Sequence, residues 1–472
     1  MTRLHSLLPG LPLVLIGCIG CTSDAAAPAA DITYALPQPD RPVVDLRFDL
    51  TTGLDSVEGD MTVEFTADRR VCELVFRLWA NKPQLVSAGN ELEVTATSVA
   101  GRAVRPRYSP AGAPVSTQGS LLRLPLRHCL PPGGHITAEV GFVLHLAEHT
   151  AERIGWSDDL AWFGTGFPIL AWQRGHGWAT NPVVNQVGEM TSSDEFRLRS
   201  LEVVVPESYE VLGTGEPLGR EDGPLVGTAV ERFRAESVRD VAVTVGELET
   251  YERELPGGVT VHLGRPSSTG AVMALDSWAD EVERAVVDTA AQLGPYPYPD
   301  LWVSLLPDCP TGIEFPGAIQ FRDLPVGAEA FSLLVSHEVA HMWFYGLVGN
   351  NQGTSPWLDE ALATYTQQLV DDAIPVVAPL TPGRVQGHVG QSMAWYARPV
   401  VRRFYGAGVY GQGAAMLAEA RTAVGSETFD RLLREYVAEQ AHRIATPTDF
   451  ATAFADAPEA LEILREYGAI GE

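Results

Sequence analysis

The chain has 472 residues, of which 45% are hydrophobic and 20% charged, a composition typical of a globular protein with two or three domains. Its 60 Asp and Glu residues outnumber its 33 Lys and Arg residues, which gives a formal net charge of −27. The chain has no basic run, and Lys82 is its only lysine. The composition therefore argues against nucleic acid as a partner.

The N-terminus has the pattern of an export signal. Arg3 provides a positive start, and the segment Leu11 to Ile19 is an apolar core that is too short to span a bilayer. We therefore expect residues 1–17 to be a signal peptide and the mature protein to be exported.

A cysteine at the end of this core predicts a lipid anchor. Residues 15–18 read Leu-Ile-Gly-Cys and resemble a bacterial lipobox, in which the cysteine becomes the lipidated first residue. Residues 18–33 then form an Ala-rich tether, and several acyl chains on Cys18 hold the protein at a membrane. We expect it at the bacterial cell surface or the periplasmic face. Processing at Cys21 and a plain secretory signal are the alternatives.

Residues 34–250 are predicted to form a β domain. Apolar and other side chains alternate in runs such as Leu46 to Leu50, Met61 to Phe65 and Leu74 to Leu78, which is the pattern of half-buried strands. Gly and Pro mark the turns between the runs. Many short strands at this spacing predict an antiparallel sandwich or saddle.

Three cysteines lie beyond the N-terminal segment. Cys72 and Cys129 fall in the β region, and Cys309 lies further along the chain. Export permits disulfides, and a bond between Cys72 and Cys129 would stabilise the fold by roughly 4 kcal/mol in the chain-entropy model. The sequence leaves two interpretations open, a disulfide and two free buried thiols.

The pattern changes after Pro256, where strands and helices begin to alternate. We expect a strand, a helix and a second strand at Val259 to Leu263, Ala271 to Leu293 and Leu301 to Leu306. A loop bounded by Gly and Pro follows at Gly312 to Gly317 and contains Glu314. We assign residues 251–395 to an α+β catalytic domain.

A metal-binding motif stands in this region. Residues 337–341 read His-Glu-Val-Ala-His, the pattern of zinc hydrolases. Residues four apart on a helix lie about 6 Å along the axis and about 40° around it, so His337 and His341 can bind one ion from one face. Glu338 can then reach a water molecule as general base. A catalytic zinc takes three protein ligands and one open position, so one ligand is still required.

Glu360 supplies the missing ligand. It follows His341 by 19 positions, in a second predicted helix with Ser355 as N-cap and Pro356 as first residue. A helix, a turn and a returning helix bring Glu360 beside the histidines. The three-histidine site of metzincins is excluded because Leu347 stands at the position of the third histidine. We therefore expect one Zn²⁺ per chain.

The end of the chain is predicted to be helical. Helices are expected around Ala414 to Val424 and Thr428 to Glu439, with a closing helical cap over Pro447 to Glu472. We assign residues 396–472 to a helical part that completes the catalytic domain.

With Glu360 in place, the sequence resembles the aminopeptidase N family of gluzincin metallopeptidases over most of the exported chain. Trp357 to Tyr365 is similar to the family's W-L-N-E-G-[FL]-A-x-Y, and Gly312 to Gly317 to its substrate-recognition motif G-[AG]-M-E-N-x-G. Gly294 to Pro299 resembles the segment just before that motif. Tyr410 to Ala414 resembles the Y-x-K-G-A segment that carries a catalytic tyrosine.

The resemblance implies a saddle-like β domain, a thermolysin-like catalytic domain and C-terminal helices. It also implies a role for each site residue: zinc binding by His337, His341 and Glu360, proton transfer by Glu338, oxyanion stabilisation by Tyr410, and binding of the substrate's free amino group by Glu314 in the motif that begins at Gly312. Tyr405 is a nearby rival for the role of Tyr410.

Some positions depart from the family pattern. Ile313 and Phe315 replace Met and Asn of the recognition motif, Asp359 replaces an Asn, and Gln412 replaces a Lys. The large C-terminal helical domain of the longer members is missing. The first two departures bear on substrate preference more than on chemistry, and the missing domain implies a more open site.

The predicted function is that of a zinc aminopeptidase, which releases N-terminal residues from peptides with a free amino terminus. A zinc endopeptidase is the nearer alternative, and Glu314 argues against it. A non-catalytic surface-binding protein on a peptidase scaffold is the other alternative. The presence of all three metal ligands and of Glu338 argues against that interpretation.

Overall fold

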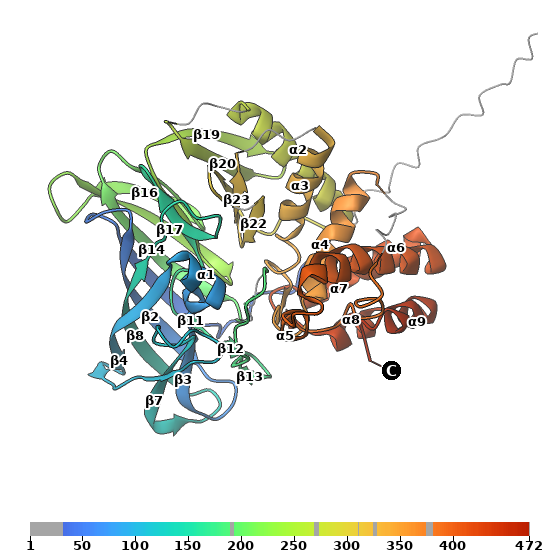
Figure 1. The fold of residues 1–472 in the computed structure, drawn as a ribbon, viewed down its shortest axis with the longest axis horizontal. Helices are drawn as coiled ribbons and strands as arrows, with labels where there is room; N and C mark the ends of the chain where they lie inside the picture. Colours follow the sequence, from blue (N-terminus) through green and yellow to red (C-terminus); the bar gives the residue numbers. More distant parts are fainter. Residues whose placement is uncertain are drawn as a thin grey trace, which may run out of the picture.

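The computed structural model describes residues 32–188, 193–268, 273–309, 311–323, 328–373 and 381–471. The predicted signal peptide, Cys18, Cys21 and nearly all of the tether lie outside these ranges. Within them the architecture confirms the expected fold class, with β sheets in the N-terminal part, a mixed α/β part and a helical C-terminal part (Figure 1). No helix in the described part of the chain is long and apolar enough to span a membrane.

The N-terminal part is organised around one large twisted sheet. Its eight strands, in spatial order, are β16 (Glu216–Asp222), β17 (Thr228–Val238), β14 (Phe196–Pro206), β1 (Val43–Asp49), β2 (Ser56–Thr66), β8 (His135–His145), β4 (Glu91–Val99) and β5 (Arg102–Ala103). The expectation of an antiparallel sheet needs one correction, because β1 and β14 pair in parallel. The side chains of β1 and β2 alternate between buried and less buried, as one covered face requires.

Two smaller sheets and a short hairpin complete this part. The first sheet contains β15 (Glu210–Gly213), β18 (Ala242–Gly246), β10 (Leu160–Gly164) and β9 (Ile154–Ser157). The second contains β11 (Ile169–Leu170), β3 (Val71–Arg77), β7 (Leu121–Leu130) and β6 (Arg107–Ser109), and β12 (Trp172–Gln173) pairs with β13 (Gly177–Trp178). Trp162 and Trp172 are buried in the hydrophobic core that these sheets share.

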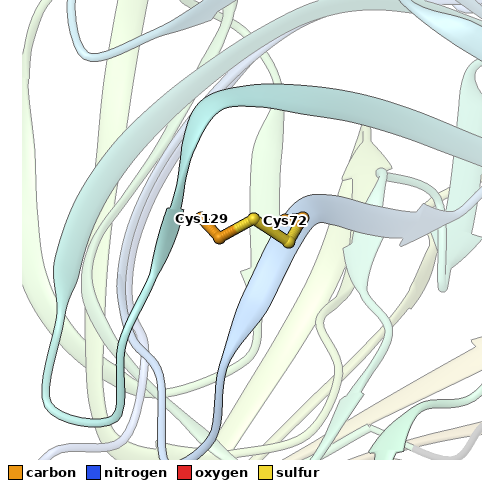
Figure 2. The surroundings of a disulfide bond; sticks show 2 residues. All are labelled: Cys72 and Cys129. Atoms are coloured by element: carbon orange, nitrogen blue, oxygen red, sulfur yellow. A yellow bond between two sulfur atoms is a disulfide. The ribbon is translucent and has the colours of Figure 1, made fainter.

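The two cysteines of this part form a disulfide. Cys72 at the start of β3 is bonded to Cys129 near the end of β7, across a sequence separation of 57 residues (Figure 2). Of the two interpretations that the sequence left open, the structure has the disulfide. Cys309, in contrast, is a buried free thiol.

A mixed five-stranded sheet carries the metal-binding half of the molecule. Its order is β19 (Leu248–Leu255), β20 (Val259–Pro266), β21 (Asp300–Leu306), β23 (Ala318–Arg322) and β22 (Gly312–Phe315). The expected loop at Gly312 to Gly317 is therefore wrong in part, because β22 is the edge strand of this sheet and pairs antiparallel with β23. The backbone of Glu314 is held by this pairing, which gives its side chain a fixed direction.

Helices pack beside this sheet and bury the second hydrophobic core (Figure 1). The first three are α2 (Leu275–Leu293), α3 (Ala328–Ala340) and α4 (Trp357–Val370). The prediction for the start of α4 was one residue early. Pro356 is the N-cap and no side chain caps this end. His341 lies in the turn directly after α3.

The C-terminal helices belong to the same core. They are α5 (Met393–Tyr396), α6 (Gln412–Val424), α7 (Ser426–Gln440), α8 (Pro447–Ala453) and α9 (Pro458–Glu466). Their apolar faces contact α2, α4 and one another. The predicted closing cap is thus two short helices, and the C-terminal helices share one packed core with the helices that carry the metal motif.

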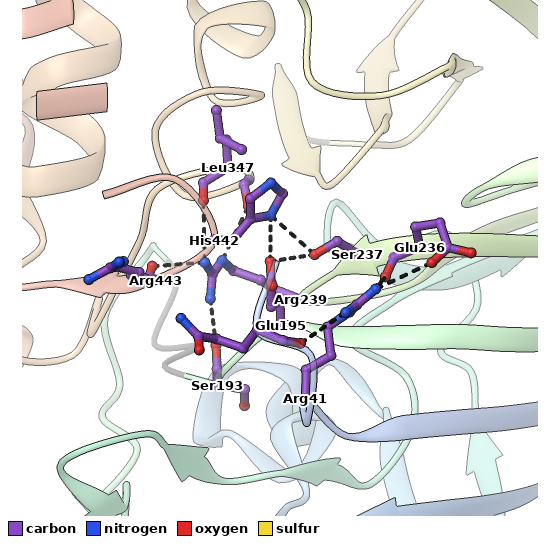
Figure 3. Close-up of polar contacts among 11 residues, drawn as sticks. Arg41, Ser193, Glu195, Glu236, Ser237, Arg239, Leu347, His442 and Arg443 are labelled. Carbon is purple, nitrogen blue, oxygen red and sulfur yellow. Dashed lines mark hydrogen bonds and ion pairs between the residues drawn. The ribbon is translucent and has the colours of Figure 1, made fainter. Parts of the chain in front are cut away.

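Buried polar contacts join the β part to the segment that follows the metal motif (Figure 3). Arg239 is only 2% exposed, and its guanidinium donates to the carbonyl oxygens of Leu347 at 3.3 Å and Arg443 at 2.8 Å. Nearby, Oε2 of Glu195 lies 2.7 Å from Nδ1 of His442. These bonds hold the β part against the segment that follows His341. The two parts of the chain that line the active-site cavity therefore keep a fixed position relative to each other.

Candidate active site

The three predicted metal ligands meet where α3 and α4 pack together. Nε2 of His337 lies 3.2 Å from Nε2 of His341, and Oε2 of Glu360 lies 3.5 Å from the first and 3.6 Å from the second. Ligand bonds of about 2.0–2.1 Å in a tetrahedral zinc site place neighbouring ligand atoms about 3.3 Å apart. The observed triangle of ligand atoms has that size.

The outer nitrogens of both histidines are held by oxygen acceptors. Nδ1 of His337 donates to Oε1 of Gln367 at 2.9 Å, and Nδ1 of His341 donates to Oδ1 of Asp359 at 2.7 Å. Gln352 donates to the other oxygen of Asp359 at 2.7 Å. These bonds fix the tautomer that leaves each Nε2 free for a metal. Asp359, noted as a departure from the family pattern, thus adds a carboxylate behind His341.

The donor set fits a zinc ion. Two imidazole nitrogens and one carboxylate oxygen are ligands that zinc accepts, and three protein ligands leave a fourth position open. Oε2 of Glu360 is buried and has no hydrogen-bond partner among the described residues, which is costly for a carboxylate unless a cation is bound there. The residues that the sequence predicted for the metal are therefore brought together.

Glu338 lies beside this triangle. Its side chain is buried, and its Oε2 has no hydrogen-bond partner in the described structure. Burial raises the pKa of Glu338 well above its usual value, and the nearby charge of Glu314 acts in the same direction. A Cβ at Gly312 would lie 2.3 Å from Oε1 of Glu338, so only glycine at this position lets β22 come so close to the carboxylate.

Glu314 points toward the same place from β22. It is 5% exposed, and its Oε1 has no partner among the described residues. Ligand-type atoms of Glu314, Glu338 and His341 lie within 4.8 Å of one another. A buried carboxylate this close to the metal ligands can bind the ammonium group of a residue whose carbonyl lies at the metal.

Tyr410 and Tyr405 occupy different positions relative to the metal ligands. The hydroxyl of Tyr410 donates to Oε1 of Glu360, and its ring stacks on that of His337 with centroids 5.9 Å apart. Tyr405 is buried behind it, edge-on to the Tyr410 ring at 5.6 Å. Burial and the charge of Glu360 raise the pKa of Tyr410 well above its usual value, so this hydroxyl stays a donor.

A cavity of about 560 Å³ joins these groups. Its catalytic wall contains all seven predicted site residues: Gly312, Glu314, His337, Glu338, His341, Glu360 and Tyr410. Tyr405 is absent from the described lining.

The opposite wall comes from the β part, and sequence reasoning missed it. Its lining includes Trp79, Lys82, Glu152, Arg153 and Val187. These residues belong to short turns without a motif. The only feature of the sequence that could have drawn attention to this wall is Lys82, because it is the single lysine of the chain.

Comparison with known proteins points to one family. Residues 292–467 match the model of the Peptidase family M1 domain. Membrane alanyl aminopeptidase of Heliothis virescens is 26% identical over 153 residues, or 30% of this chain, and Aminopeptidase M1-C of Oryza sativa subsp. japonica is 25% identical over 267 residues, or 51% of this chain. These matches span 15% and 29% of the two relatives.

Solved structures share the fold over nearly the whole chain. The M1 zinc metallopeptidase from Deinococcus radiodurans superposes with a TM-score of 0.65 at 21% identity, covering 94% of this chain and 98% of that one. A mutant of that peptidase bound to a Tyr-Ser-Ala substrate gives a TM-score of 0.63 at 20% identity, covering 91% and 94%. Residues 292–467, which contain the three candidate metal ligands, therefore form a domain of peptidase family M1.

Proposed function

We propose that the protein is a zinc aminopeptidase that removes single residues from the free amino ends of peptides. The observation that carries this proposal is the buried carboxylate of Glu314, which shares one cavity with the metal ligands and with Glu338. The relatives named above include alanyl and other aminopeptidases, and a structural neighbour binds a tripeptide.

The residues divide the chemistry between them. A zinc ion held by His337, His341 and Glu360 supplies a Lewis acid that polarises the scissile carbonyl and lowers the pKa of water. Glu338 accepts the proton of the attacking water and passes it to the leaving amine. The hydroxyl of Tyr410 donates a hydrogen bond to the oxyanion that forms on the carbonyl.

Glu314 determines where the chain is cut. Metal and general base can hydrolyse any amide that reaches them, so selectivity for the terminal bond requires a group that recognises the α-ammonium. A carboxylate held on β22 within one residue's length of the metal ligands does this. An endopeptidase has no use for such an anchor, because an internal residue carries no ammonium.

Substitution of the anchor tests this function. Glu314→Ala is expected to lower kcat/KM on aminoacyl amides by about tenfold to a hundredfold, because an ammonium–carboxylate hydrogen bond is worth about 1.5–3 kcal/mol. The substitution leaves the metal ligands in place, so zinc content should stay at that of the native protein.

The same assay includes two controls. Activity of the native protein should disappear with a chelator and return with zinc, and N-acetylated peptides should be poor substrates. Efficient cleavage of acetylated peptides at internal bonds would instead make the protein an endopeptidase. Absence of hydrolysis by the zinc-loaded protein would favour the non-catalytic binding protein.

We further propose that the enzyme is an exported lipoprotein. The support is the sequence of residues 15–18 and the apolar core before it. Cys18→Ser should abolish acylation and release the protein from the membrane fraction, as mass spectrometry of the mature N-terminus and fractionation would detect. An unacylated native N-terminus would refute the anchor, and acylation at Cys21 would relocate it.

A further inference from the structure

The carboxylate behind His341 belongs to a series of buried hydrogen bonds. Oδ1 of Asp359 accepts from Nδ1 of His341 at 2.7 Å, and Oδ2 of Asp359 accepts from Nε2 of Gln352 at 2.7 Å. Each of the three residues is only 1% exposed. Because the other ring nitrogen of His341 is a candidate metal ligand, the series leads from Gln352 through Asp359 and His341 to the metal site.

The two candidate histidine ligands differ in the group that accepts from their outer nitrogen. Nδ1 of His337 donates to the neutral amide oxygen of Gln367 at 2.9 Å, whereas Nδ1 of His341 donates to the carboxylate of Asp359 at 2.7 Å. Hydrogen bonds to ionised acceptors are about twice as strong as bonds to neutral ones. A carboxylate in this place also makes the imidazole a more basic ligand. We therefore expect His341 to bind a metal more strongly than His337 does.

The surroundings of residue 359 suit Asp better than Asn. Both groups that contact its side chain, the ring N–H of His341 and the amide N–H of Gln352, are donors. An ionised carboxylate offers an acceptor oxygen to each of them. The amide of an Asn has one acceptor and one donor, so its NH₂ group would face the NH₂ group of Gln352. The family pattern has Asn at this position, and the chain therefore combines a change of residue with a partner that fits the change.

The position of Asp359 in the fold also favours a negative charge. The residue lies in the first turn of α4, as Glu360 does, and the positive end of the helix dipole stabilises carboxylates there. A buried carboxylate is nevertheless costly unless a positive group compensates its charge. The His341 ring provides that compensation when a metal ion is bound to its other nitrogen, so the carboxylate and the bound ion stabilise each other.

We propose that Asp359 is a positioning residue that tightens zinc binding by acting through His341, and that Gln352 holds it in place. The bond to the carboxylate directs Nε2 of His341 toward the other ligands and increases the electron density that this nitrogen offers to the ion. As a result, the protein keeps its zinc at free zinc concentrations about tenfold to a hundredfold lower than it otherwise could. The inference requires the metal site, but it does not require the proposed aminopeptidase specificity.

The test measures the zinc dissociation constant of the full-length protein by competition with a chromophoric chelator of known zinc affinity. Asp359→Asn preserves the size of the side chain and removes its charge. We expect this variant to bind zinc about tenfold to a hundredfold more weakly than the native protein, and to release zinc faster when the chelator is in excess. Zinc binding within about threefold of the native affinity would overturn the proposal.

Two double variants separate the charge of Asp359 from the pattern of donors and acceptors around it. Asp359→Asn with Gln367→Glu moves the carboxylate from behind His341 to behind His337, and it should recover most of the lost zinc affinity. Asp359→Asn with Gln352→Glu gives the Asn amide an acceptor but leaves His341 without a carboxylate, and zinc binding should stay weak. Recovery in the second variant and not in the first would show that the charge at His341 is not the cause.

A single variant keeps the proposal testable if Asp359→Asn does not fold, as circular dichroism of the metal-free protein would reveal. Gln367→Glu in the native background adds a carboxylate behind His337, where Oε1 of Gln367 already accepts from the ring. We expect zinc binding about tenfold tighter than in the native protein. An unchanged dissociation constant would contradict the idea that a carboxylate behind a histidine ligand strengthens this site.

Zinc affinity and hydrolysis are measured separately, so failure of this inference is distinguishable from failure of the proposed function. If Asp359→Asn weakens zinc binding but the zinc-loaded native protein cleaves no aminoacyl amide, the aminopeptidase function fails and the role of Asp359 stands. If the native enzyme is active and Asp359→Asn binds zinc equally tightly, the role of Asp359 fails and the aminopeptidase function stands.

Discussion

Glu338→Gln should abolish nearly all activity and leave the metal in place. The carboxylate of Glu338 is buried, and its Oε2 has no partner in the described structure. This oxygen can therefore accept a hydrogen bond from a water molecule, because it makes no bond that stabilises the fold. A carboxamide has the same shape but cannot accept the proton, and general base catalysis contributes about 10²–10⁴-fold. We expect a fall in kcat of that size on aminoacyl amides.

The controls for this variant are zinc content and thermal stability. Glu338 is not one of the three ligand residues, so elemental analysis should find one zinc per chain in native and variant protein alike. The melting temperature should not fall, because the neutral amide removes both the cost of burying the Glu338 carboxylate and its repulsion by Glu314, the two effects that raise the pKa of Glu338. A variant that keeps its zinc and more than about a tenth of native kcat would remove Glu338 from the role of base.

Tyr410→Phe should lower kcat by about a hundredfold or more, the usual effect of removing one oxyanion donor. KM should change little, because the hydroxyl contacts the developing charge rather than the bound ground state. In the structure this hydroxyl donates to Oε1 of Glu360, which keeps it at the metal ligands until a substrate oxygen competes for it.

Tyr405→Phe is the matched control, since it removes the same atom from a neighbouring ring. Tyr405 is outside the described cavity lining, and its ring contacts that of Tyr410 edge-on. We expect near-native kcat for this variant, with any effect limited to stability. If Tyr405→Phe lost most of its kcat and Tyr410→Phe kept it, the catalytic tyrosine would be Tyr405 instead.

The sequence by itself predicted which residues gather at the candidate metal site. The spacing of His337, Glu338 and His341 is a property of one helical turn, and Glu360 followed from the need for a third ligand in a returning helix. Local periodicity also located several strands, among them β1, β2 and β3, and the longer helices, because alternation and 3.6-residue spacing depend only on neighbours in the chain. Small errors fell at element ends, as at Pro356, because the ends of helices fray and their boundaries shift by one or two residues.

Only the tertiary structure decided what surrounds those residues. Lys82 and Arg153 come from turns more than 150 residues before the metal ligands, and their place in the cavity depends on how the β part packs against β22 and α3. The pairing of Cys72 with Cys129 depends on β3 and β7 becoming neighbours. The choice between Tyr410 and Tyr405 depends on which ring faces Glu360. Contacts between distant segments are fixed by burial of the whole core, and no local pattern encodes them.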